Sequence, residues 1–215
     1  MKIIRPLCCA TMLFYAASAQ ANPVFYPGGT MVMLDNNAME NSALVNYTVT
    51  PRYAVGYRAL YDRDTNATFH GAQIDTLLKR WNNPDSQGNL YALGAVGMID
   101  QPHRADDAWD PAGLVGMQAD WETRRYFTLY ENKLKFADDS SQTEFTQMGR
   151  LGIAPYVAES GSLHTWLMVQ FDHQPEGNDS FTTTPLVRLF YGSYLIEAGY
   201  NIDEEKPMIN AVLRF

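Results

Sequence analysis

The feature that most restricts the fold of this chain is a recurring segment of about ten residues in which apolar and polar side chains alternate. Successive side chains of a β-strand point to opposite faces, so each such segment predicts a strand with one apolar face. The clusters between the segments are rich in Asn, Asp, Ser, Gly and Pro, which favour turns. We find no long stretch with the 3.6-residue period of an amphipathic helix. The chain is therefore predicted to be all-β.

The pattern predicts twelve strands, or ten if the first and fifth segments do not form strands. The expected ranges are 29–35, 43–50, 53–63, 67–81, 89–99, 112–123, 125–137, 143–158, 162–173, 182–192, 194–203 and 207–215. No low-complexity tract or linker interrupts them, so residues 22–215 are predicted to form one domain.

The connections between these segments alternate between two kinds. The tight ones are Thr50–Arg52, Asn82–Asn89, Thr123–Arg124, Glu159–Gly161 and Gly192–Ser193. The others are mostly more polar: Asp35–Ser42, Asp62–Asn66, Asp100–Pro111, Asp138–Gln142, His173–Phe181 and Asp203–Lys206. Short turns on one rim and longer loops on the other are typical of an outer-membrane β-barrel, whose short turns face the periplasm. An even strand count then places both termini on the periplasmic side.

The last segment ends on an aromatic residue. Its apolar face carries Ile209, Ala211, Leu213 and Phe215. This ending resembles the C-terminal strand of bacterial outer-membrane β-barrel proteins. The resemblance implies a single antiparallel up-and-down transmembrane barrel in the outer membrane of a Gram-negative bacterium. It also implies that outer-membrane lipids surround the barrel and that the β-barrel assembly machinery recognises the four residues.

Residues 1–21 resemble a bacterial secretory signal peptide. Two basic residues precede an apolar run at 7–17, and a small-x-small cleavage pattern follows at 19–21. The run is shorter than the roughly 20 residues that a helical span needs. Both cysteines, Cys8 and Cys9, lie within this segment. Disulfides, thiol nucleophiles and thiolate metal sites are therefore not expected in residues 22–215.

Alternation alone does not decide which face of the sheet is outside. A soluble barrel of lipocalin type, secreted or periplasmic, places the apolar face inward around a ligand. Three features favour lipid outside, and the first is the C-terminal strand that ends on Phe215. Small residues, Gly56, Gly116, Gly152 and Gly199, interrupt the polar face, as is natural in a filled lumen. Tyr and Trp recur at strand ends, as in aromatic girdles: Tyr53, Tyr61, Trp81, Trp121, Tyr126, Tyr191 and Tyr194.

With lipid outside, six acidic and seven basic side chains are expected in the lumen. They are Arg58, Asp75, Lys79, Asp120, Glu122, Glu131, Lys133, Lys135, Arg150, Asp172, Arg188, Glu197 and Arg214. The acidic excess behind the net charge of −8 is expected mainly in the loops, for example at Asp35 and Glu40.

A nearly balanced set of charges in a narrow barrel favours mutual ion pairs that fill it. The leading interpretation is a small barrel of structural or passive type with a charge-paired lumen. The alternative is a narrow channel in which Arg58, Arg150, Arg188, Lys133 and Lys135 guide a small anionic solute. The resembled class includes twelve-stranded channels for acidic sugars and nucleosides, an analogy at the level of the fold.

No catalytic pattern is found. Some outer-membrane barrels hydrolyse lipids with a His and a Ser two residues apart on one strand. The second residue after each histidine of this chain is not Ser: Ala72 follows His70, Ala105 follows His103, Trp166 follows His164 and Pro175 follows His173. We therefore expect no enzyme and no cofactor. The absence of a strongly basic segment counts against a nucleic-acid partner.

A role in metal handling is a minor alternative. Met31, Met33 and Met39 offer thioethers that suit copper(I). His103 lies near Asp106 and Asp107 in the longest predicted loop. The simpler interpretation is that the methionines fill gaps or face lipid, so no metal site is assigned.

Overall fold

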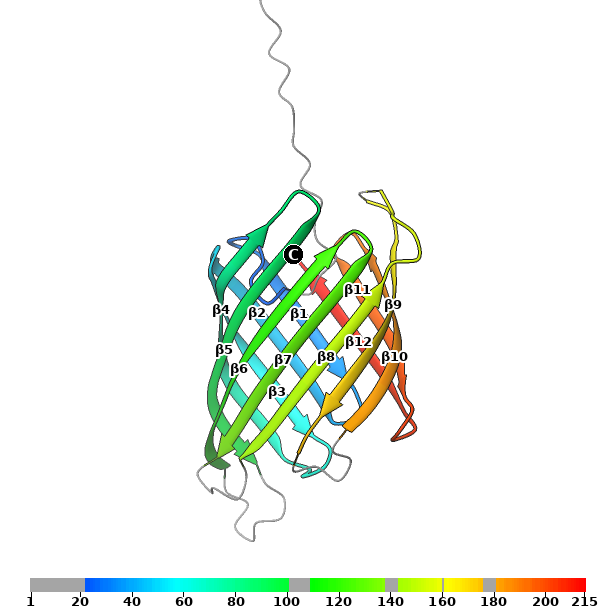
Figure 1. The fold of residues 1–215 in the computed structure, drawn as a ribbon. Coiled ribbons are helices and arrows are strands. Elements are labelled where there is room, and N and C mark those ends of the chain that lie inside the picture. Colours follow the sequence, from blue (N-terminus) through cyan, green and yellow to red (C-terminus); the bar gives the residue numbers. More distant parts are fainter. Residues whose placement is uncertain (1–21, 101–108, 138–142, 160, 176–180) are drawn as a thin grey trace, which may run out of the picture.

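The computed structural model describes residues 22–100, 109–137, 143–159, 161–175 and 181–215. The predicted signal peptide lies outside the described residues. Twelve strands are present (Figure 1). Their bounds are β1 Thr30–Asn36, β2 Glu40–Thr50, β3 Tyr53–Asp62, β4 Thr68–Asn82, β5 Ser86–Asp100, β6 Trp109–Thr123, β7 Tyr126–Ala137, β8 Glu144–Ile153, β9 His164–His173, β10 Phe181–Tyr191, β11 Tyr194–Asn201 and β12 Lys206–Arg214.

The strands form one closed antiparallel barrel in which each pairs with its neighbours in the sequence. β1 and β12 close it, with Met31 opposite Arg214 and Asn36 opposite Ile209. Two further backbone hydrogen bonds join Thr30 and Phe215 beyond the last pair, at 2.8 and 3.1 Å. The predicted all-β, up-and-down barrel is confirmed with twelve strands rather than ten. Among the residues that the structure describes, no helix is long and apolar enough to cross a membrane.

The largest difference from the expected strand bounds is in β8, which ends at Ile153 instead of residue 158. Pro155 lies two residues beyond this end, and a proline cannot donate a hydrogen bond to the ladder. β2 begins earlier than expected, at Glu40. The Asn37 side chain accepts bonds from the backbone nitrogens of Met39 and Glu40, at 2.9 and 2.8 Å, and so forms a compact turn.

The two rims of the barrel differ as the connections predict. The tight connections after β2, β4, β6 and β10 lie at the upper rim of Figure 1, together with the C-terminus. We call this the short-turn rim and the opposite one the long-loop rim. The turn between β10 and β11 contains Gly192 at φ 60°, a left-handed conformation that glycine adopts without strain.

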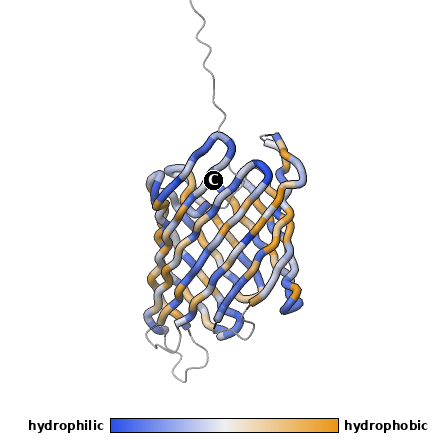
Figure 2. Tube along the Cα trace, viewed as in Figure 1, coloured by the Kyte–Doolittle hydropathy of each residue, from blue (hydrophilic) through white to orange (hydrophobic). Residues whose placement is uncertain are grey.

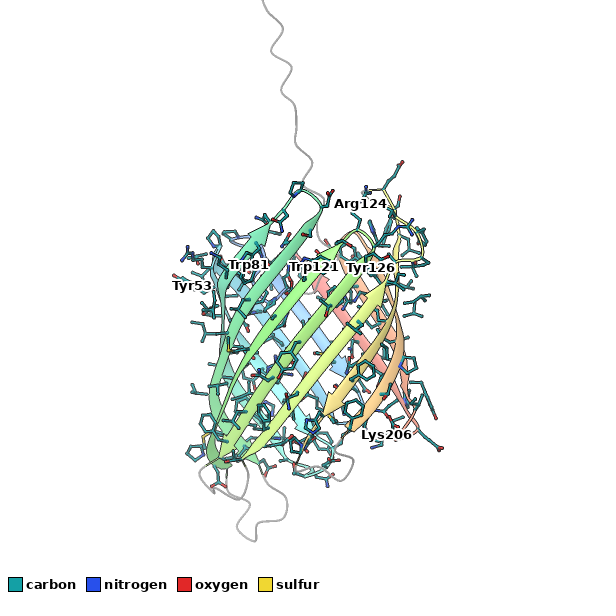
Figure 3. All side chains as sticks on the ribbon, in the orientation of Figure 1. Tyr53, Trp81, Trp121, Arg124, Tyr126 and Lys206 are labelled. Carbon is teal, nitrogen blue, oxygen red and sulfur yellow. The ribbon has the colours of Figure 1, made fainter. Side chains whose placement is uncertain are left out.

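Large apolar side chains cover the outside of the barrel. Along the strands, hydrophobic and hydrophilic residues alternate, and hydrophilic residues gather at the rims (Figure 2). The middle of the outer surface carries exposed aliphatic residues such as Val55, Ile74, Val96, Val115, Leu151, Leu167, Leu189, Ile196 and Ile209. Tyr53, Trp81, Trp121 and Tyr126 point outward near the short-turn rim (Figure 3). This surface has the layout of a lipid-facing band with an aromatic girdle.

The interior is not uniformly polar. One buried cluster near the long-loop rim joins Phe69, Ile99 and Leu114 with smaller neighbours on β3 to β6. Phe127, Trp166, Met168, Leu186 and Met208 form another on the opposite side. Apolar side chains therefore fill part of the lumen and confine its polar groups to what remains.

Candidate functional site: the charged lumen

Twelve of the thirteen charged residues expected in the lumen lie inside the barrel. Eight are buried: Arg58, Asp75, Asp120, Glu122, Arg150, Arg188, Glu197 and Arg214. Glu131, Lys133 and Asp172 line an internal cavity, and Lys135 forms ion pairs beside it. Strand alternation therefore placed each of these residues on the correct face.

Lys79 is the exception and requires a correction. The register of β4 against β5 shifts between Leu77 and Lys79, so Leu78 is an extra residue in a β-bulge. Lys79 lies opposite Leu90, whose neighbours in β5 point inward, so Lys79 points outward. Its neighbour Arg80 takes the inward position at the short-turn rim. Arg80 Nε donates to Asn89 Oδ1 at 2.6 Å.

Four acidic residues inside the barrel were not expected there. Asp35 and Glu40, assigned to loops from the sequence, line the cavity, as do Asp62 and Glu144. All four lie at or near strand ends on the long-loop rim, where β1 and β2 reach further than expected. Together with Arg80 and the twelve residues placed inside as expected, these four make ten acidic and seven basic side chains at the interior positions named so far. The lumen is therefore acidic, not balanced.

Glu197 is the centre of a buried ion network. Its carboxylate accepts bonds from Arg150 Nη1 at 2.9 and 3.1 Å and from Arg188 Nε at 2.6 Å. Asn210 Nδ2 donates a further bond at 3.0 Å. Gln170 binds Arg150 from the other side, 3.1 Å from its Nε. One carboxylate thus compensates two arginines, and every partner comes from β8 to β12, on one wall of the barrel.

A second network crosses the lumen near the long-loop rim. Lys133 on β7 lies 2.8 Å from Glu131 on its own strand and 3.7 Å from Glu40 on β2. Lys135 pairs with Asp62 on β3 and with Glu144 on β8, both at 2.5 Å. β7 is five strands from β2 and four from β3 in the closed order. These two lysines therefore join distant strands across the lumen.

Side-chain amides donate the hydrogen bonds to the buried Asp75 carboxylate, which has no direct ion pair with a described cation. Gln73 Nε2 lies 2.9 Å from both carboxylate oxygens, and Asn46 Nδ2 donates at 2.8 Å. Arg58 joins this group through Gln73, with its Nε 2.5 Å from Gln73 Oε1. The amides connect a basic and an acidic residue without direct contact between them.

A cavity of about 160 Å³ lies among these groups in the half of the barrel nearer the long-loop rim. Its walls include the residues of both networks except Lys135, and also Asp35 and Asp172. Ser42 donates to Asp35 at 3.5 Å, and Gln170 donates to Asp172 at 2.8 and 3.0 Å. Neither carboxylate has a Lys or Arg nitrogen within 4.0 Å in the part of the chain that the structure describes. The cavity therefore presents two carboxylates without an ion-pair partner.

The methionine and histidine positions give the metal hypothesis little support. Met31 is buried in an apolar cluster, while Met33 and Met39 line the cavity. Within the described ranges, no three His, Cys, Asp or Glu residues gather in a way that suits a metal ion. His103, Asp106 and Asp107 lie outside the described residues.

The described histidines lie apart from one another. His70 is on the outer face, where its Nδ1 lies 2.7 Å from the Tyr57 hydroxyl. His164 contacts the Phe190 ring, and His173 Nδ1 lies 3.0 Å from Gln147 Nε2.

Comparison with known proteins identifies a fold but no family. No family model matches the sequence, and no curated protein matches it. Among solved structures, the chain is similar to the KdgM porin in complex with disordered oligogalacturonate, with a TM-score of 0.50 and 7% identity over 87% of this chain and 98% of that one. For the KdgM porin alone, the TM-score is 0.49 and the sequence identity is 8%, with the same coverage of both chains. For the translocator domain of the autotransporter NalP from Neisseria meningitidis, the TM-score is 0.40 and the sequence identity is 9%. The match covers 86% of this chain and 84% of that one.

Proposed function

We propose that this chain is a narrow passive channel of the Gram-negative outer membrane that favours small cations. The observation that carries the proposal is the acidic cavity inside a closed barrel whose outer surface is apolar. A soluble lipocalin-like barrel needs the opposite arrangement, with the apolar face around the ligand and the charges in water. A closed barrel is also suited to the hydrocarbon core of a membrane, because it leaves no backbone N–H or C=O group unpaired at a sheet edge.

The interior charges support a preference for cations over the anions expected from the sequence. Ten acidic residues face seven basic ones, and Asp35 and Asp172 lack an ion-pair partner among the described residues. Rings of excess carboxylates in a pore attract cations and repel anions. Oligogalacturonate, named for the neighbouring KdgM structure, is a polyanion. We do not propose it for this chain because the same carboxylates would oppose its entry.

A planar bilayer experiment tests the proposal directly. We expect small, steady openings and a reversal potential that shows cation preference. Asp35→Asn with Asp172→Asn should reduce that preference, since both substitutions remove from the cavity a carboxylate that has no direct ion-pair partner among the described residues. Asp203→Asn with Glu205→Gln, in the turn before β12, is the matched control and should leave selectivity unchanged. Anion-selective openings that are indifferent to the cavity variant would contradict the proposal.

The second candidate function is a closed structural barrel. The bridges from Lys133 and Lys135 across the lumen favour it, because together they tie β7 to β2, β3 and β8. Absence of openings in the same bilayer experiment, with the barrel correctly folded, would select this alternative.

Assembly is proposed to depend on Phe215 and the apolar face of β12, read by the β-barrel assembly machinery from the periplasm, where both termini would lie. The Phe215 ring is exposed, while its backbone bonds Thr30. Phe215→Ala keeps those two bonds and removes only the ring, so it should lower the outer-membrane level severalfold. Tyr191→Ala, also exposed at the short-turn rim, is the control. Quantitative immunoblots of outer membranes measure both, and equal levels would reject the assembly role.

A further inference from the structure

The residues that precede β1 enter the barrel instead of leaving it. The segment Asn22–Phe25 begins at the short-turn rim, where Figure 1 also places the C-terminus. Asn22, Pro23 and Val24 are buried, and Val24 is only 1% exposed. This burial makes the segment part of the packed interior.

Val24 is the apolar anchor of the segment. It packs in one buried cluster with Ala54 of β3, Leu77 of β4 and Tyr91 of β5. All four side chains lie on the inner face near the short-turn rim. Burial of apolar side chains against one another stabilises this arrangement, so the cluster holds the segment against the β3–β5 wall.

Polar contacts fix the backbone of the same segment. Asn46 Nδ2 donates to the Pro23 carbonyl at 2.9 Å, and Phe25 N donates to Thr48 Oγ1 at 3.1 Å. Both partners come from the inner face of β2, where Asn46 and Thr48 are buried. Their side chains would lose these partners if the segment left the lumen.

Arg214 of β12, which lies two strands from β2 in the closed order, holds the Phe25 end of the segment. Its guanidinium carbon lies 5.0 Å from the centre of the Phe25 ring, within the range of a cation–π contact. Arg214 is buried, yet its Nε and Nη2 donate no hydrogen bond to any described residue. The aromatic face of Phe25 is therefore one of its few favourable contacts. The segment thus reaches from the β2–β5 wall to β12.

We infer that Asn22–Phe25 is an internal gate that closes the short-turn end of the lumen. The charged cavity has no lining residue from this segment or from the Val24 cluster, so it ends before the short-turn rim is reached. The inference rests on the proposed channel function. It adds a second constriction, built from apolar and backbone contacts, to the lysine bridges near the other rim.

The gate can be opened by two substitutions inside the segment. Val24→Ser with Phe25→Ser removes the apolar anchor and the ring that faces Arg214. Single-channel conductance in planar bilayers should rise about twofold or more, because the narrowest section limits ion flow. The control is Val49→Ser with Tyr191→Ser, likewise a valine and an aromatic residue, but exposed outward near that rim. An unchanged conductance in a folded gate variant would overturn the inference.

A measurement on the unmodified protein makes the test independent of how the variant folds. Hydrogen exchange of the Phe25 amide, followed by NMR in detergent micelles, should be slowed to the range of the strand amides. Exchange at the rate of an unstructured peptide would overturn the gate while the channel proposal stands. A protected amide without conductance in either protein would overturn the channel proposal and the gate with it.

Discussion

At the scale of single residues, Glu197 is where a change should matter most for stability. Glu197→Gln leaves the buried Arg150 and Arg188 side by side without their shared carboxylate. Removing one partner of a buried ion network typically costs about 3 kcal/mol or more. We expect a loss of that order in the free energy of unfolding, measured by urea titration in lipid vesicles with tryptophan fluorescence.

Glu204→Gln is the matched control for this prediction. Glu204 lies 2.6 Å from Lys206 at the long-loop rim; the Glu204 side chain is 11% exposed and the Lys206 side chain 44%, so the lysine end of the pair is solvated. Such pairs contribute about 0–1 kcal/mol. If both variants unfold at the same urea concentration as the unmodified protein, other groups balance the charges of the two arginines. The network is then not a stabilising unit.

Residue orientation was predictable from the sequence wherever a strand runs without interruption. Arg58, Arg188 and Glu197 follow the two-residue alternation, and all three are inside. The alternation failed at Lys79, because one extra residue in a bulge reverses every later side chain. It also missed Asp35, since polar residues near a strand end look the same in sequence whether they belong to the loop or to the strand.

At the scale of elements, the bulge in β4 permits a deletion that an ordinary strand does not. Leu78 has no opposing residue in β5, so its deletion leaves the pairs Leu77 with Tyr91 and Lys79 with Leu90 intact. The deletion variant should insert and stay resistant to SDS. Deletion of Ile74, paired opposite Gly94 in unbroken register, should turn the following side chains to the wrong face and prevent insertion. Equal levels of the two variants in outer membranes would show that the register here is not restrictive.

Element positions were more predictable than element contacts. The alternating pattern located all twelve strands, and Pro155 explains the largest difference in bounds. Contacts across the lumen, such as Lys135 with Asp62, depend on the register of all intervening strand pairs. The inward course of Asn22–Phe25 left no signal either, because a short apolar stretch before the first strand has no periodicity to interpret.

At the scale of the whole molecule, closure is the property with the broadest consequence. Every strand has two hydrogen-bonded neighbours, so opening the barrel requires the loss of a complete strand–strand ladder. SDS at room temperature should not achieve this, whereas boiling should. We therefore expect unboiled protein to migrate differently from boiled protein in SDS gels. The same material should remain with the outer-membrane fraction after osmotic shock, since its apolar outer surface needs lipid or detergent. Identical migration together with release by osmotic shock would instead indicate a soluble barrel, and would contradict both the membrane assignment and the channel built on it.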